Sequence, residues 1–190
     1  ISCAKGKDLL GRLEEEKVLL PELLKTMPER TRKIIEMLQR NGHAHIRGYC
    51  NVDPIIGIQN YLCAKQILEE YKGRLTYELV AFPQHGLLRS DTVPYMRQAM
   101  EQGADVVGLT DPGLLDRDVL RSLRAAFDIA KEFDRPLDMH LHEQGTLGLY
   151  TMQRLCDMVE EYGWQGRVNI SSAVALSSID SMSLQAIVQR

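Results

Sequence analysis

The chain has 190 residues, of which 44% are hydrophobic and 26% charged, and its formal net charge is −3. This composition fits one globular domain with a substantial core and lacks the basic excess typical of nucleic-acid binding. No apolar run approaches the roughly 20 residues of a membrane span. Four scattered cysteines without a CxxC spacing indicate neither a zinc knuckle nor a disulfide framework. We therefore expect a cytoplasmic protein whose partner is a small molecule.

The first 42 residues predict a helical lead-in. Leucines recur at helical spacing between Asp8 and Leu24, and Pro28 can start a second helix that runs to about Leu38. Asn41-Gly42 is a typical helix stop. We predict a lead-in over 1–42 and strand–helix units over 43–190, within one domain. The chain opens without an initiator Met, and we expect it to begin inside something larger.

After the lead-in, strand-like and helical segments alternate along the chain. Strands are predicted at 44–50, 76–82, 105–110, 137–142 and 167–172, and helices at 55–71, 92–102, 116–133, 147–162 and 178–188. Such units predict a parallel sheet with right-handed crossovers, either doubly wound or a TIM-type barrel. No strand is followed by a glycine-rich nucleotide fingerprint, and polar residues gather at the carboxyl ends of the strands. Both observations favour an α/β fold of the (β/α) TIM-barrel type.

The predicted barrel is partial, because an eight-stranded barrel needs three more strands than the five predicted here. We expect the strands in consecutive order around a curved sheet, with the helices outside. Two edges of such a sheet stay open unless other chain completes it, and open edges favour association into a homo-oligomer.

The stretch from Leu137 to Glu143, LDMHLHE, alternates apolar and polar residues at the period of a strand. Alternation places Asp138, His140 and His142 on one face, which suits the wall of a polar cavity because buried polar groups need partners. Two imidazoles with a nearby carboxylate can supply a metal ligand and a proton-transfer group. The alternative interpretation is an exposed edge strand.

Three motifs resemble the cytosine-deaminase-like branch of the amidohydrolase superfamily. They are VAFPQHG at 80–86, GADVVG at 103–108 and DMHLHE at 138–143, and their order and spacing match as well. The resemblance extends from about Gly6 to about Leu176. It implies a metal-dependent TIM barrel that hydrolyses carbon–nitrogen bonds of cytosine-like or triazine-like rings. A divalent metal, zinc or iron, is then the expected cofactor.

The resemblance also implies roles for three residues. His140 matches a metal ligand, Glu143 the glutamate that carries protons between metal-bound water and the ring, and Gln84 the glutamine that reads the ring's amide edge. The side-chain amide of Gln both donates and accepts, so it suits an edge with N–H and C=O groups. Each residue also has a plain structural alternative, respectively a core histidine, a solvated loop acid and a turn-former. We expect the three to converge on one cavity, with Asp138 deeper in its wall.

Departures from the family pattern support a second interpretation. Ser172 stands at the sixth-strand histidine, Tyr49 stands where the second strand tends to have histidine, and the first-strand His-x-His and eighth-strand Asp are not found. Serine is a weak metal ligand and no base near neutral pH. The chain could therefore be a catalytically degenerate scaffold or ligand-binding protein, and we expect the isolated chain to be inactive. His43-Ala44-His45 could replace the missing pair, but it lies at the amino end of its strand, away from catalysis in a barrel.

Overall fold

The computed structural model describes residues 8–190, so Cys3 and the start of the family resemblance at Gly6 lie outside it. Five parallel strands form one sheet in the order β1-β2-β3-β4-β5. The strands are β1 (His45–Asn51), β2 (Thr76–Phe82), β3 (Val106–Thr110), β4 (Leu137–His140) and β5 (Val168–Ser171). Consecutive order with parallel pairing confirms the predicted arrangement and excludes a doubly wound sheet, in which the order reverses about a central strand.

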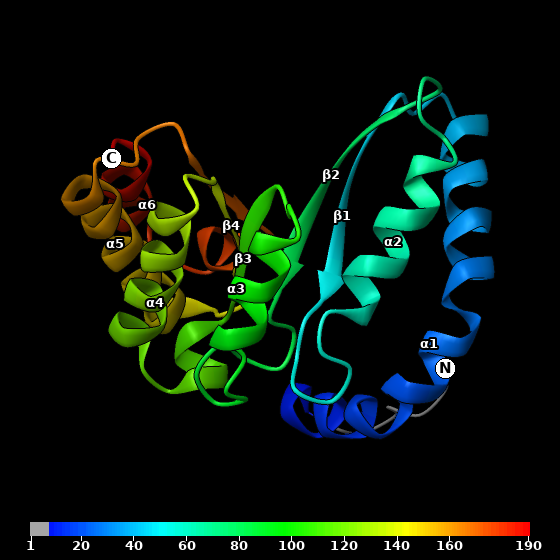
Figure 1. The fold of residues 1–190 in the computed structure, drawn as a ribbon. Helices are drawn as coiled ribbons and strands as arrows, with labels where there is room; N and C mark the ends of the chain where they lie inside the picture. The colour runs from blue at the N-terminus through cyan, green and yellow to red at the C-terminus, as the bar shows by residue number, and fades with distance from the viewer. Residues whose placement is uncertain (1–7) are drawn as a thin grey trace.

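Helices follow the strands and cover one face of the sheet (Figure 1). They are α1 (Leu9–Arg40), α2 (Gln59–Glu69), α3 (Val93–Glu101), α4 (Val119–Glu132), α5 (Gly145–Tyr162) and α6 (Ser181–Val188), with a π-helix, η1 (Pro112–Asp116), and a 3-10 helix, η2 (Val174–Ser177). In α4 the buried residues recur every three or four positions, and the side chain of Asp118 caps its first turn by accepting from the N–H of Arg121 at 3.1 Å. Within residues 8–190, no helix combines the length and apolarity needed to cross a bilayer.

The lead-in differs from its prediction in one respect. We predicted two helices separated near Pro28, whereas α1 is one helix of 32 residues with Pro21 and Pro28 inside it. Proline cannot donate to the carbonyl four residues earlier, so it bends a helix without necessarily ending it. Figure 1 shows the bend: the amino-terminal part of α1 runs along the bottom of the molecule, and the remainder rises beside α2.

Side-chain contacts across the inner face show that the sheet is strongly curved. In a flat sheet, β1 would lie about 14 Å from β4 and about 19 Å from β5, at roughly 4.8 Å per strand. Yet the guanidinium of Arg47 on β1 donates to Asp138 on β4 at 2.8 Å. The hydroxyl of Tyr49 on β1 lies 3.2 Å from that of Ser171 on β5. The inner face is therefore concave, as in part of a barrel.

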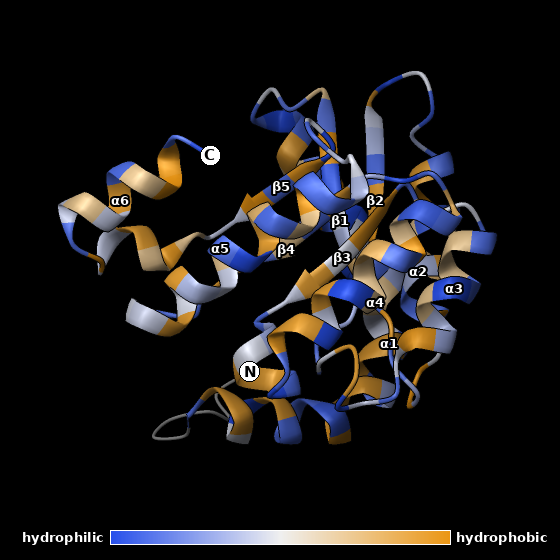
Figure 2. Ribbon diagram, turned by 90° about the vertical axis from the view of Figure 1, so that its left-hand side faces the viewer, coloured by the Kyte–Doolittle hydropathy of each residue, from blue (hydrophilic) through white to orange (hydrophobic). Residues whose placement is uncertain are grey.

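Apolar residues pack on both faces of the sheet, but unequally. Leu137, Met139 and Leu141 are fully buried in the main core between the sheet and the helices. Figure 2 shows that β3 is hydrophobic along most of its length, and its Val107 and Leu109 belong to this core. On the concave face, a smaller cluster of Val80, Phe82 and Val106 packs with the ring of Tyr49. The predicted alternation of β4 is therefore confirmed for residues 137–140, and it leaves Asp138 and His140 on the concave face.

Candidate active site

A buried carboxylate organises the concave face beneath His140. Asp138 is fully buried, and its Oδ2 accepts hydrogen bonds from Arg47 at 2.8 Å, Tyr49 at 3.1 Å and Asn169 at 3.0 Å. Its Oδ1 accepts from the hydroxyl of Ser171 at 2.9 Å. Arg47 also pairs with Glu78 at 2.8 Å, so one guanidinium connects three strands. This Asp138 network satisfies a charge that would otherwise be costly to bury. Asp138 lies on the concave face, and its place in the wall of a substrate cavity stays a prediction.

His140 is the last residue of β4, and its ring lies among aromatic side chains. The ring centroid is 4.4 Å from that of Tyr49 and 4.9 Å from that of Phe82. The ring of His142 lies edge-on at 5.9 Å. Burial among these rings disfavours the charged form and holds the pKa of His140 below its usual value. A neutral imidazole is the form that can bind a metal ion.

Asp111 ends β4 earlier than predicted. We expected a strand to residue 142, but the N–H groups of His142 and Glu143 donate to the side-chain Oδ1 of Asp111, at 2.6 Å and 3.1 Å, instead of to main-chain carbonyls of neighbouring strands. The other oxygen of this buried carboxylate lies 2.8 Å from Nδ1 of His142, whose ring is about half exposed. The His142 ring is therefore held by Asp111, and it stays within 5.9 Å of the ring of His140. Asp111 itself adopts a left-handed backbone with φ 37°, which a short polar side chain tolerates better than most.

Glu143 is buried and held by three hydrogen bonds. Its Oε1 accepts from the N–H groups of Gly113 at 2.7 Å and Leu114 at 2.9 Å, both in η1, and its Oε2 accepts from the hydroxyl of Thr151 at 2.5 Å. Burial outweighs these donors and raises the pKa of the Glu143 carboxyl. This result excludes the solvated loop acid that was the alternative interpretation of Glu143.

Further carboxylates join the loops at this end of the sheet. Asp116, at the end of η1, accepts from the N–H groups of Leu87 at 3.3 Å, Leu88 at 3.0 Å and Arg89 at 3.0 Å, in the loop after β2. With Asp111 and Glu143, it ties the loops that follow β2, β3 and β4 to one another. The π-helix between them is a rare element that is frequent at functional sites.

Gln84 follows the carboxyl end of β2, in the same rim of loops. It is partly buried, and its backbone N–H donates to the carbonyl of Phe82 at 3.0 Å. Phe82 contacts the ring of His140, so Gln84 lies two residues from a direct neighbour of the proposed ligand. The structure thus brings all three predicted residues to the carboxyl end of the sheet. Their convergence on one substrate stays a prediction.

The donor set of the described chain does not fit a complete metal centre. Within residues 8–190, no group of three or more His, Cys, Asp or Glu side chains could hold a metal ion. Ser172 is exposed just beyond β5, and the hydroxyl of Tyr49 is engaged by Asp138 and Ser171. His43 and His45 are exposed at the amino end of β1, far along the strand from the rim. His140 is therefore a single candidate ligand, and residues 8–190 do not complete its set.

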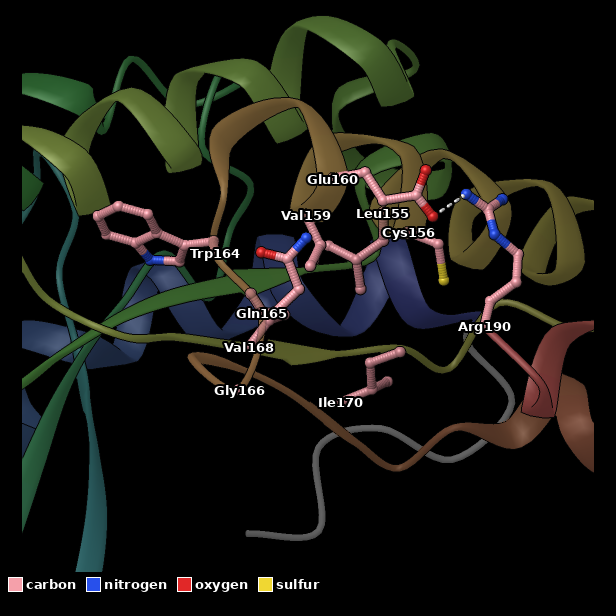
Figure 3. A pocket seen from close by; sticks show the side chains of 10 residues that line it. All are labelled: Leu155, Cys156, Val159, Glu160, Trp164, Gln165, Gly166, Val168, Ile170 and Arg190. Carbon is pink, nitrogen blue, oxygen red and sulfur yellow. Dashed lines mark hydrogen bonds and ion pairs between the residues drawn. The ribbon is translucent and has the colours of Figure 1, made fainter.

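A cavity of about 340 Å³ lies elsewhere, between α5, β5 and the last residue of the chain (Figure 3). Val168 and Ile170 contribute to its wall, and these alternate along β5 with Asn169 and Ser171 of the Asp138 network. Because successive strand residues face opposite sides, the cavity lies on the outer face of the sheet. It is a gap in the outer packing layer and not part of the rim that carries Glu143.

Several residues of the site had no recognised signal in the sequence. In the sequence, Asp111 and Thr110 are recognisable only as polar residues at the end of a predicted strand, and Thr151 lies inside a predicted helix where no motif marks its hydroxyl. The Asp138 network depends on contacts between strands that are not neighbours. The one available signal is the alternation of side-chain directions along each strand. It places Arg47 and Tyr49 on the same face of β1, and Asn169 and Ser171 on the same face of β5.

Known proteins resemble this chain over most of its length, although no family model matches it. It is 34% identical over 186 residues to the uncharacterized protein YahJ of Escherichia coli, covering 97% of this chain and 40% of that protein. It is 33% identical over 154 residues to N-isopropylammelide isopropyl amidohydrolase of a Pseudomonas strain, covering 78% of this chain and 38% of that protein.

Solved structures agree with these sequence similarities. 5-Methylcytosine deaminase from Klebsiella pneumoniae superposes with a TM-score of 0.81 at 25% identity, over 95% of this chain and 44% of that one. N-isopropylammelide isopropylaminohydrolase from Burkholderia multivorans gives a TM-score of 0.75 at 31% identity, over 77% and 38%. The resemblance to the cytosine-deaminase-like branch of the amidohydrolase superfamily is confirmed, and the fold is a partial TIM-type barrel. The chain spans about 40% of the length of these relatives.

Proposed function

We propose that the protein acts as a cytosine-deaminase-like amidohydrolase, which hydrolyses a carbon–nitrogen bond of a small heterocycle. The observation that carries this proposal is Glu143, a buried carboxyl with a raised pKa, held by three donors just beyond His140 at the carboxyl end of a parallel sheet. Barrel enzymes place their catalytic groups at this end. The named relatives, an amidohydrolase of N-isopropylammelide and a deaminase of 5-methylcytosine, support the substrate class.

In this proposal each residue has a distinct task. Glu143 transfers a proton to the departing nitrogen, and its raised pKa brings the carboxyl closer to the pH at which such a group must both take and release protons. Gln84 contacts the amide edge of the ring with one donor and one acceptor. His140 is the proposed ligand for zinc or iron, whose remaining ligands are not supplied by residues 8–190.

One observation favours the alternative, a scaffold that binds a ligand without turnover. The rings of Tyr49 and Phe82 pack directly on His140, and the Tyr49 hydroxyl is committed to the Asp138 network. Aromatic faces suit the binding of a planar ring whether or not it is hydrolysed. The two functions are distinguished by measuring amine release and ring binding on the same preparation.

Replacing Glu143 with Gln is expected to lower turnover by about 10²–10⁴-fold, the usual contribution of a positioned acid–base group. The assay measures ammonia or amine released from cytosine, 5-methylcytosine and N-isopropylammelide, with added zinc or iron(II), by this chain and by any longer natural form of it. Release from none of these rings by any form would overturn the proposal. Ring binding without release would support the scaffold instead.

The same variant has a built-in control for folding. Gln can accept from Gly113 and Leu114 and donate to Thr151, so the hydrogen bonds of Glu143 can be kept. Because burial raises the pKa of Glu143 above the ordinary 4.5, its contribution to stability is present below that pH and is lost as the pH rises through the folded value. In urea unfolding, the stability of Glu143→Gln relative to wild type should therefore rise as the pH is raised from about 4 to about 8.

The 190-residue chain alone is expected to bind Zn²⁺ weakly, since tight zinc sites use three or four ligands and His140 is one. His140→Ala should abolish the remaining affinity in calorimetry. His45→Gln, at an exposed imidazole 3.6 Å from Glu78, is the matched control and should change nothing. Tight stoichiometric binding that survives His140→Ala would instead make His43 and His45 the better candidates.

A further inference from the structure

Two kinds of hydrogen-bond donor hold the carboxyl group of Glu143, one kind on each oxygen. Oε1 accepts from the main-chain N–H groups of Gly113 at 2.7 Å and Leu114 at 2.9 Å. Oε2 accepts from the hydroxyl of Thr151 in α5 at 2.5 Å. Glu143 is 3% exposed and Thr151 is fully buried, so these partners, and not bulk water, surround the carboxyl.

The two oxygens differ in what they can do when the carboxyl is protonated. A main-chain N–H has no lone pair, so a proton on Oε1 would face two donors and find no acceptor. A hydroxyl has one proton and two lone pairs, so Thr151 can donate to the carboxylate and can accept from the protonated acid. The arrangement of donors therefore directs the proton of Glu143 to Oε2.

The packing of α5 determines where this hydroxyl lies. Gly148 is buried, and it lies three residues before Thr151, on the same side of the helix. A Cβ at Gly148 would overlap the carbonyl oxygen of Glu143 and would lie 2.6 Å from the Cβ of Ala175. The helix thus approaches the main chain of Glu143 as closely as a glycine allows, and this contact holds Thr151 beside the carboxyl.

The charges around Glu143 come from the loops at this end of the sheet. Burial raises the pKa of the Glu143 carboxyl most strongly, and the nearby Asp111 raises it further. The hydroxyl of Thr151 is the largest of the effects that lower it. Of the other charged groups here, Asp116 accepts from N–H groups in the loop after β2, and His142 pairs with Asp111. Thr151 is thus the neighbouring side chain that favours the charged form.

We propose that Thr151 is a positioning residue for Glu143, which places the proton of the carboxyl on Oε2 and stays hydrogen-bonded to that oxygen in both charge states. The inference rests on the proposed function for the use of this proton, since Glu143 would then give it to the departing nitrogen from Oε2. Loss of the hydroxyl removes a donor from the charged form, so the carboxyl would take up its proton at a higher pH.

Carbon-13 NMR of the glutamate side-chain carboxyls tests the proposal on the 190-residue chain, without substrate or metal. The signal of Glu143 is the one that is lost in Glu143→Gln, and its chemical shift against pH gives a titration midpoint. Each hydrogen bond to a carboxylate lowers its pKa by roughly 1 pH unit. We therefore expect Thr151→Val, which keeps the shape of the side chain, to raise the midpoint by about 1 pH unit. Thr151→Ser, which restores the hydroxyl, should return it to the wild-type value.

Thr92→Val is the matched control. Thr92 is as fully buried as Thr151, and its hydroxyl donates to the carbonyl of Gly86 at 3.1 Å, in the loop after β2. This variant should leave the midpoint of Glu143 unchanged. An unchanged midpoint in Thr151→Val would overturn the proposal, as would an equal rise in Thr92→Val.

A measurement on the wild-type protein covers the case in which Thr151→Val does not fold. The Cβ signal of Thr151 should titrate with the midpoint of Glu143, because the hydroxyl changes from donor to acceptor, and in Glu143→Gln it should not titrate. A Thr151 signal that does not follow Glu143 in the wild type would contradict the proposal. Absence of turnover would overturn the proposed function and leave these midpoints unaffected, so the two failures are distinguishable.

Discussion

Replacing Asp138 with Asn is expected to lower the free energy of unfolding by about 3 kcal/mol, the low end for breaking a buried ion pair. The low end applies because Arg47 is 36% exposed and keeps Glu78 as a partner. The side-chain amide of the variant would turn its NH₂ group either toward the donors of Arg47, Tyr49 and Asn169 or toward the hydroxyl of Ser171, which would lose this acceptor. Urea unfolding measures the change.

The control is Asp134→Asn, the same substitution in an exposed ion pair. Asp134 is 84% exposed and lies 2.6 Å from Arg167. Surface pairs of this kind contribute less than about 1 kcal/mol. If the two variants lost equal stability, the Asp138 network would have no special part in holding β1 against β4 and β5.

Gly108→Ala is expected to destabilise the fold by about 3 kcal/mol, near the upper limit for overpacked cores. A Cβ at this position in β3 would lie 2.5 Å from the carbonyl oxygen of Ala81 and 2.8 Å from the ring of Phe82. The backbone oxygen cannot withdraw without breaking the register of β2, so the sheet must shift. Phe82 would also lose its position against His140, which near-ultraviolet circular dichroism and thermal unfolding can report.

Gly48→Ala on β1 is the matched control. Its added Cβ would lie 3.2 Å from Cδ2 of Leu79, the end of a flexible side chain. Removing a strand glycine also reduces the entropy lost on folding, so Gly48→Ala should be neutral within about 1 kcal/mol. A Gly108→Ala variant as stable as Gly48→Ala would contradict the close approach of β2 and β3.

Local patterns predicted the sheet well because each strand carries its own signal. All five strands lie within a few residues of their predicted ranges, and the order follows from the repeated strand–helix unit. The errors occurred where a distant side chain decides the local structure. After His140, Leu141 still donates to the carbonyl of Ser171, but Asp111, about thirty residues away in sequence, takes the N–H groups of His142 and Glu143, and the strand goes no further. The bend of α1 without a break likewise depends on what its two halves contact.

The candidate site was predicted only in part, again because contacts between segments that are distant in the sequence leave no local signal. DMHLHE and VAFPQHG predict His140, Glu143 and Gln84 as site residues because residue types and their spacing can be read directly from the sequence. What surrounds these residues, including Thr151 and Tyr49, is set by three-dimensional neighbours. The role of each could not be inferred from its own segment.

The carboxylates that tie the rim loops together bear on how readily such a rim can change during evolution. Asp116 and Glu143 bind main-chain N–H groups at Leu88, Arg89 and Leu114, and every residue except proline offers that donor. The side chains at these three positions are therefore free to vary while the loops keep their anchorage. Selection could therefore change the surface of the rim by mutating the anchored positions, as long as the anchoring acids are retained.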